Sequence, residues 1–243
     1  MQKTVSEAKR IGAFYHFDSF AQNNLTNSRF FSLFLVPDLR WFFILDFEST
    51  CFEDESRKPA EIIEFPVVVL DSVTGTLVDS FQSFVKPTEN PELSVFCSNL
   101  TSIQQCDVED APTLAVVLKR FEHWLRKIKE TLGCSFKGQP ATTAIFVTWT
   151  DWDISTCLWD ECRRKKLPLP GDMLNRIDLK AIFQQWLGSH KVGRKWRGGL
   201  KDALNLVGLH FEGRQHRGID DAKNTARLLS HLLSKNVLNL ATS

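Results

Sequence analysis

Asp46 and Glu48 stand two positions apart at the end of a short apolar run. In a strand their carboxylates project to the same face, about 6 to 7 Å apart along the chain. Two such carboxylates repel each other unless a cation neutralises them. The alternative is a solvated strand end with two ordinary acidic residues. Because residues 42–45 are all apolar, we place Asp46 at the lip of a buried sheet.

A further carboxylate, Asp153, lies in the segment TWTDWDIS, directly after another apolar run and at the start of a helical pattern. Open α/β sheets often place ligand groups at this position. Asp153 could equally cap the helix that follows it. Asp151 is a second candidate for either role.

The segment QHRGIDDAKN, residues 215–224, holds a histidine and two adjacent aspartates at the start of the last helical pattern. At 100° per residue, the apolar positions of this helix fall within about 80° of one another. Asp220 lies nearly opposite this stripe, whereas Asp221 lies about 110° from its centre, where it can reach the edge of a sheet. Asp221 is therefore the better site candidate, and Asp220 suits solvent or a helix start. His216 is a site residue or an ordinary surface histidine.

Carboxylates and an imidazole brought together from such segments suit one kind of chemistry. Mg²⁺ and Mn²⁺ take oxygen ligands from carboxylates, and two such ions about 3.5 to 4 Å apart stabilise an in-line phosphoryl displacement. A neutral imidazole can accept the proton of the attacking water. The residue types therefore favour phosphodiester hydrolysis.

Hydrophobic periodicity predicts the elements that must position these residues. Apolar runs separated by the turn signal DSVTG indicate three strands of an antiparallel meander, and a fourth strand follows an amphipathic helix that Pro112 opens. The fold class expected is α/β, a mixed sheet with helices on its faces. The strands are expected at 41–47, 62–70, 76–87 and 143–149, and the helices at 112–128, 153–165, 178–187, 199–207 and 219–234, with a polar loop before Pro112.

The composition excludes several broad classes. With 243 residues and 43% hydrophobic content, the chain can form one main domain. Its formal net charge of +1 gives no chain-wide attraction to nucleic acid or membranes. The apolar segment at 30–36 is too short to cross a bilayer. Six cysteines without a CxxC pair favour reduced thiols in an intracellular protein, in the cytoplasm or nucleus, with an organelle as the alternative.

ILDFEST, TWTDWDIS and HRGIDDAKN occur in the order and with the spacing of the three exonuclease motifs of the DEDDh (DnaQ-like, RNase T-like) superfamily. DFESTC, EIIEFPVVVLD, WDIS and GIDDAKNTARL more closely resemble its enhanced-RNAi exonuclease branch, that of the histone-mRNA 3′-exonuclease. The resemblance covers about residues 41–235, and each motif agrees beyond its catalytic letters.

The resemblance implies an RNase H-like fold and a 3′-to-5′ exoribonuclease that uses two Mg²⁺ or Mn²⁺ ions and releases 5′-mononucleotides. His216 matches the general base. The family's four metal-binding carboxylates match Asp46, Glu48, Asp153 and Asp221. The alternatives are a DNA exonuclease of the same fold and a nucleic-acid-binding adaptor that does not cleave.

The resemblance also suggests substrate contacts. Trp152 matches an aromatic position near the terminal nucleotide, although it could be a core tryptophan. Phe47 is a further candidate, as are Leu100 and Thr101 in NLTSI, which resembles a segment that touches the last base but carries Ser102 where glycine is usual. Residues 1–40 do not fit the RNA-binding domain of the SAP type found in the histone-mRNA enzyme, so stem-loop binding is not carried over.

A basic stretch at 190–217 could grip the substrate. It holds seven basic and two acidic side chains, a local net charge of +5, and we single out Arg194, Lys195 and Arg197 as substrate contacts. The alternative is a solvated face. RRKK at 163–166 could extend this patch or simply end a helix favourably.

The expected organisation is an N-terminal extension at 1–40, an exonuclease domain at 41–236 and a tail at 237–243. The expected partners are RNA 3′ ends, single-stranded or with a short overhang, with single-stranded DNA as the alternative. We expect a monomer and no membrane association.

Overall fold

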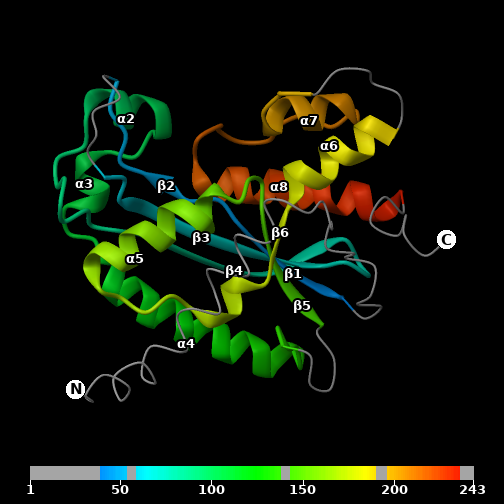
Figure 1. Ribbon diagram of the computed structural model, residues 1–243, viewed down its shortest axis with the longest axis horizontal. Coiled ribbons are helices and arrows are strands. Elements are labelled where there is room, and N and C mark those ends of the chain that lie inside the picture. Colours follow the sequence, from blue (N-terminus) through cyan, green and yellow to red (C-terminus); the bar gives the residue numbers. More distant parts are fainter. Residues whose placement is uncertain (1–38, 54–58, 138–142, 190–195, 236–243) are drawn as a thin grey trace, which may run out of the picture.

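A computed structural model of the chain describes residues 39–53, 59–137, 143–189 and 196–235 (Figure 1). The expected N-terminal extension, apart from Leu39 and Arg40, and the expected C-terminal tail lie outside these residues. No described helix is long and apolar enough to span a membrane. All six cysteines are free thiols.

One mixed sheet forms the centre of the molecule. Its strands are β1 (Trp41–Leu45), β2 (Glu48–Ser49), β3 (Ile62–Asp71), β4 (Thr76–Phe84), β5 (Ala144–Thr148) and β6 (Arg176–Asp178). β3 pairs antiparallel with β1, β2 and β4, whereas β5 runs parallel to both β1 and β6. Strands buried on both faces are expected to be continuously apolar. β1 is apolar throughout, and β5 is apolar up to its last residue, Thr148. The predicted meander is confirmed as the β1, β3 and β4 pairs.

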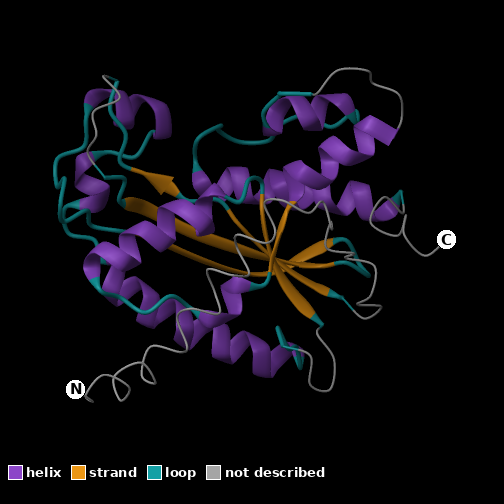
Figure 2. Cartoon of the chain, viewed as in Figure 1, coloured by secondary structure: helices purple, strands orange, loops and turns teal. Residues whose placement is uncertain are grey.

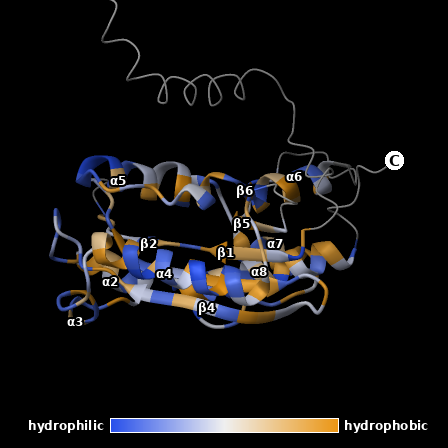
Figure 3. Ribbon diagram, turned by 90° about the horizontal axis from the view of Figure 1, so that it is seen from below, coloured by the Kyte–Doolittle hydropathy of each residue, from blue (hydrophilic) through white to orange (hydrophobic). Residues whose placement is uncertain are grey.

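Helices cover both faces of this sheet (Figures 1 and 2). One face carries α4 (Leu114–Leu132), a π-helical segment (Asp153–Leu158) and α5 (Trp159–Lys165). The other carries α6 (Leu179–Ser189), α7 (Leu200–Leu206) and α8 (Gly218–Ser234). Figure 3 shows mostly hydrophobic colour on β1 and β5, whereas α4 and α5 alternate hydrophilic and hydrophobic residues. The predicted α/β fold with a helix-flanked mixed sheet is therefore confirmed.

The core under α4 is rich in phenylalanine. Phe136 stacks on Phe146 with ring centroids 4.8 Å apart, and Phe65 contacts Phe121 at 5.1 Å. Burying an apolar side chain of this size stabilises the fold by about 1.5 to 3 kcal/mol. The buried residues of α4 are those that the helical spacing predicted: Leu114, Val117, Leu118, Phe121, Leu125 and Ile128.

Short elements depart from the sequence prediction. The expected polar loop before Pro112 contains α2 (Val95–Thr101) and α3 (Gln105–Val108). Residues 176–178 form β6, although a helix was expected to begin at 178. These elements have too few apolar residues to show a period. The start of α2 is instead set by a cap, the Ser94 hydroxyl, which accepts the Cys97 N–H at 2.9 Å.

Candidate active site

The predicted site residues meet at one edge of the sheet. Asp46 directly follows β1, and Asp153 follows β5, the strand that runs parallel to β1 with Leu45 opposite Thr148. Glu48 begins β2, and α8 starts next to the end of β1. A Cβ atom at Gly218 would lie 2.5 Å from the Asp46 carbonyl oxygen. Glycine at this position is therefore what lets α8 approach the carboxylates.

Asp153 faces the site and does not cap a helix. Its Oδ1 accepts the Phe47 N–H at 2.8 Å, which ties the end of β5 to the segment after β1. It is the first residue of the π-helical segment, a feature that often occurs at functional sites. The other candidate, Asp151, accepts two hydrogen bonds from Arg176 and is engaged in that ion pair. The structure therefore separates the two aspartates in favour of Asp153.

Asp220 and Asp221 point to different surroundings. The Asp220 carboxylate accepts the Arg214 N–H at 3.0 Å and holds the loop before α8. The Asp221 carboxylate accepts the N–H groups of His216 and Arg217, and it lies close enough to Asp46 to raise the pKa of that residue. The expected stripe of α8 was partly wrong, because Ile219 and Leu233 are half-buried while Leu228 and Leu232 are fully buried.

Burial and mutual repulsion dominate the electrostatics of the four carboxylates. Burial raises the pKa of Asp46 well above its ordinary value, and repulsion from Asp153 and Asp221 raises it further. Burial raises the pKa of Glu48 to about 9, with repulsion from Asp221 as the next cause. Burial raises the pKa of Asp153 and of Asp221 to about 7 each. Each residue therefore lies where added positive charge would be strongly favoured.

This donor set fits divalent cations. Oδ2 of Asp221 is buried and has no hydrogen-bond partner, so the fold leaves one carboxylate oxygen of the site free for a ligand. Among the described residues, no three His, Cys, Asp or Glu side chains are already arranged around a metal position. Mg²⁺ takes much of its coordination from water and substrate phosphates, so these carboxylates would supply only part of its ligands.

His216 is exposed at the rim of this site. Its backbone has a φ of 60°, the left-handed region, and its N–H donates to Asp221. The loop is further held by Gly213, where a Cβ atom would lie 2.6 Å from the Asp220 carboxylate. Asp220 and Asp221 thus both position the His216 loop, but only Asp221 also faces the other carboxylates.

One buried acid of the site was missed by the sequence analysis. Glu64, in β3, pairs in register with Glu48 and accepts hydrogen bonds from Gln82 at 2.6 Å and from the Gly218 N–H at 3.1 Å. Its Oε2 also lies 3.5 Å from the Arg217 guanidinium. Glu64 therefore anchors the first turn of α8. The signal was a charged residue inside an otherwise apolar run.

The predicted substrate contacts divide into exposed and buried side chains. Trp152 is 43% exposed, so it is a surface tryptophan and not part of the core. Phe47 is only 4% exposed and packs on Phe65, so the proposed contact of its ring with substrate does not fit. Thr101 is buried and donates to Cys97 O, while Leu100 is half-buried. Ser102 has a φ of 63°, which explains why glycine is usual there.

The predicted basic patch is only partly described. Arg194 and Lys195 lie outside the described residues, and Arg197 is exposed. Trp196 packs on Phe183 with centroids 5.1 Å apart, so it belongs to the core. The RRKK segment does not extend the patch, because its first three residues are paired with acids: Arg163 with Asp160, Arg164 with Glu89, and Lys165 with Glu61 and Glu161.

Comparison with known proteins gives consistent matches. A family model described as Exonuclease, of the RNase T type, matches residues 43–229. ERI1 exoribonuclease 2 of Danio rerio is 43% identical over 197 residues, which is 79% of this chain and 34% of the relative. The 3′-5′ exonuclease Snipper of Drosophila melanogaster is 39% identical over 202 residues, 80% of this chain and 69% of the relative. The chain spans about a third of the length of the ERI1 exoribonuclease 2 relatives.

Solved structures agree in fold. The nuclease domain of 3′hExo, a DEDDh family member bound to rAMP, superposes with a TM-score of 0.71 at 33% identity, over 82% of this chain and 94% of that one. Exonuclease I, at 12% identity and a TM-score of 0.59, shows the same RNase H-like exonuclease fold. From the match to residues 43–229 and the coverage of Snipper, the chain belongs to the RNase T-like exonuclease family, in its DEDDh class and ERI1-type branch.

Proposed function

We propose that this chain is a metal-dependent 3′-to-5′ exoribonuclease that hydrolyses phosphodiester bonds at RNA 3′ ends and releases 5′-mononucleotides. The observation that carries this proposal is the cluster of four interacting carboxylates, none with an ion-pair partner among the described residues, beside His216. RNA is favoured over DNA because the ERI1-type relatives are named exoribonucleases and 3′hExo is described with rAMP.

Two Mg²⁺ or Mn²⁺ ions are the proposed cofactors. The residues that would hold them are Asp46, Glu48, Asp153 and Asp221, all oxygen donors of the kind these cations prefer. When bound, such ions stabilise negative charge on the attacking and leaving oxygens of phosphoryl transfer. The unpartnered Oδ2 of Asp221 supports this assignment.

The remaining steps fall to side chains of the protein. An imidazole nitrogen of His216 accepts the proton of the attacking water, as expected for a general base at the rim of the cleft. Asp221 holds the backbone N–H of His216 and so sets the position of the imidazole relative to the carboxylates. Trp152 offers an exposed ring on which the terminal base can stack, worth about 1 to 3 kcal/mol without sequence preference.

The proposed substrate is a single-stranded 3′ end or a short overhang, acted on by a monomer. The six free thiols support a reducing intracellular compartment. Side-by-side degradation of single-stranded RNA, stem-loop RNA with a short overhang, and single-stranded DNA ranks these substrates. Light scattering checks the monomer.

The direct test measures release of labelled 5′-mononucleotides from single-stranded RNA that carries the label in its internal phosphates. We expect activity that EDTA abolishes and that His216→Asn lowers about 10²-fold or more while metal binding persists. Asparagine is the matched replacement because it tolerates the left-handed backbone at this position. Activity unchanged in Asp46→Ala would falsify the proposal. RNA binding at full strength in EDTA, with no degradation over hours, would indicate an adaptor instead.

A further inference from the structure

A concave surface lies beside the loop that carries His216. It sits between α7 and the segment that leads into His216, and its volume is about 500 Å³. This volume is within the range of pockets that bind nucleotide-sized ligands. We call it the α7 groove, lined by Lys201, Asn205, His210, Phe211, Arg214 and Gln215.

The α7 groove holds positive charge that the protein does not neutralise. Of the basic residues described between 196 and 217, Arg217 is paired with Glu64. Neither Lys201 nor Arg214 has an ion-pair partner among the described residues, and both are exposed.

The acids that lie near the groove are all engaged elsewhere. Glu212 pairs with Arg227 at 2.6 Å, and Asp202 accepts the Gly199 N–H at 2.9 Å. Asp220 binds the backbone N–H of Arg214 and not its guanidinium. The charges of Lys201 and Arg214 therefore remain available to a ligand.

Both cations are held in place by neutral groups. Lys201 Nζ donates to Gln215 Oε1 at 3.3 Å, and Arg214 Nη2 donates to the Asn99 carbonyl at 2.9 Å. The second bond joins the α7 groove to the end of α2, next to Leu100. Arg214 also precedes His216 by only two residues, so the α7 groove is adjacent to the loop that carries His216.

We propose that the α7 groove binds the sugar-phosphate backbone of a single-stranded nucleic acid upstream of its 3′-terminal nucleotide. This inference rests on the proposed function. Lysine and arginine supply the phosphate contacts that dominate such affinity, while Phe211 offers an aromatic surface and Asn205 and Gln215 offer amide groups. A substrate of one nucleotide fills the carboxylate cleft alone, so the groove acts only on longer substrates and lowers KM, not kcat.

The test compares a long and a minimal substrate with the full chain. We expect Lys201→Gln/Arg214→Gln to raise KM for a single-stranded 20-mer about tenfold and to leave kcat unchanged. Hydrolysis of the p-nitrophenyl ester of a nucleoside 5′-monophosphate should be unaffected. The slope of log binding constant against log salt concentration should fall by about 1.4 for two lost phosphate contacts, at about 0.7 each on single strands.

Controls separate this inference from the proposed function. Lys223→Gln removes an exposed positive charge outside the groove and should leave KM and kcat unchanged for both substrates. Lys201→Gln alone avoids the Arg214 bond to Asn99 and should give about half the change in salt slope. An unchanged KM for the 20-mer, or an equal loss on both substrates, would overturn the inference. If the wild type cleaves neither substrate, the proposed function fails, and 20-mer binding by Asp46→Asn still tests the groove by the same salt slope.

Discussion

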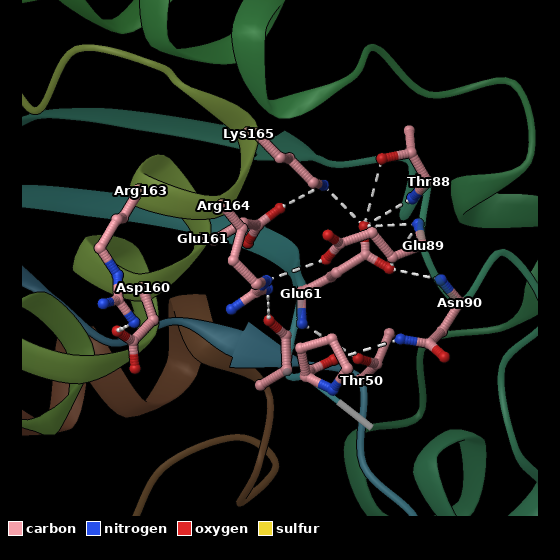
Figure 4. A network of polar contacts seen from close by, with 12 residues as sticks. Thr50, Glu61, Thr88, Glu89, Asn90, Asp160, Glu161, Arg163, Arg164 and Lys165 are labelled. Carbon is pink, nitrogen blue, oxygen red and sulfur yellow. Dashed lines mark hydrogen bonds and ion pairs between the residues drawn. The ribbon is translucent and has the colours of Figure 1, made fainter. Parts of the chain in front are cut away.

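Two groups of buried carboxylates in this protein have opposite surroundings. The first group, which we call the Lys165 network, consists of Glu61, Glu161 and Lys165 (Figure 4). Glu61 is fully buried and lies directly before β3. It accepts the N–H groups of Thr88, Glu89 and Asn90, and Lys165 Nζ lies 2.6 Å from both Glu61 and Glu161. The network joins α5 to the segment after β4, and both of its buried carboxylates have a cation within hydrogen-bond distance.

The cluster of Asp46, Glu48, Asp153 and Asp221 has no such ion pair among the described residues, and the cation next to it, Arg217, is paired with Glu64. Burial alone would raise the pKa of Glu61, but Lys165 and the three N–H donors lower it below its ordinary value. Burial raises the pKa of Glu48 to about 9, and there its neighbours are other acids that raise it further. A buried carboxylate that is paired with a cation of the protein stabilises the fold. The four unpaired carboxylates would instead be stabilised by a bound cation. The difference supports the proposal that these four carboxylates carry the function.

The largest expected effect separates two adjacent aspartates. Asp221→Asn should lower RNA hydrolysis at least about 10³-fold, beyond the 10- to 100-fold that is typical of residues supporting a metal ligand. Asp220→Asn should keep most of the activity, because an amide oxygen can still accept the Arg214 N–H. Single-turnover rates on labelled RNA measure both. The reverse result would mean that the metal-binding role has been assigned to the wrong aspartate.

Lys165→Met tests the other side of the comparison. Removing the one cation leaves Glu61 and Glu161 buried without it, and breaking such a pair costs about 3 to 5 kcal/mol of stability. Urea denaturation should show this loss, with activity per folded molecule unchanged. Adding Glu61→Gln and Glu161→Gln should recover part of it. A stable Lys165→Met variant without activity would show that the network serves the site as well as the fold.

The sequence was sufficient to predict the long helices and strands and the positions of the four carboxylates within them. The spacing of apolar residues predicted α4 because that helix buries one regular face. Asp46 and Asp153 could be placed at one sheet edge because each follows an apolar strand. Asp221 was separated from Asp220 by helix geometry, although the helix buries a wider face than the pattern indicated.

What could not be predicted depends on contacts between distant residues. Lys165 and Glu61 are 104 positions apart, and no local pattern links them. Glu64 looked like an exception within an apolar run, since its partners Gln82, Arg217 and Gly218 lie in other elements. Helix α2 was missed altogether, because a helix of seven residues shows no clear apolar period and is stabilised by its caps.

The stability of the metal-free protein should depend on pH because the four carboxylates lack ion-pair partners in the described part of the chain. The folded-state pKa values of Asp153 and Asp221 are about 7, above their ordinary value of 3.8, so the folded state binds more protons than the unfolded state. The stability that these protons contribute is fully present below pH 3.8 and is lost as pH rises through about 7.

The measurement is the Tm of metal-free protein at pH 5.5 and pH 8, compared with an Asp153→Asn/Asp221→Asn variant. Relative to that variant, the wild type should lose about 5 °C or more over this interval. Saturating Mn²⁺ should raise the wild-type Tm more at pH 8, because protonated carboxylates do not bind it. A wild-type Tm that rises with pH relative to the variant would show that the four carboxylates are not destabilised by their charge, and the contrast with the Lys165 network would then be wrong.

The smallest expected effect asks whether backbone strain also distinguishes the two regions. Ser102 ends α2 beside the cleft with φ 63°, and Lys166 ends α5 beside the network with φ 55°. A non-glycine residue in this conformation destabilises the folded state by about 1 to 2 kcal/mol. Replacing it with glycine removes this strain but increases the conformational entropy of the unfolded state, which offsets about 0.5 to 1 kcal/mol of the gain. Ser102→Gly and Lys166→Gly should each raise the free energy of unfolding by about 0.5 to 1 kcal/mol. Gly133→Ala, at φ 60° with open space around its Cβ position, should lower it by a similar amount. If Ser102→Gly and Lys166→Gly gain equal stability and RNA hydrolysis is unchanged, this strain is an ordinary feature of helix ends. If Lys166→Gly gains stability but Ser102→Gly loses RNA hydrolysis, the strain at Ser102 contributes to the function of the carboxylate cluster.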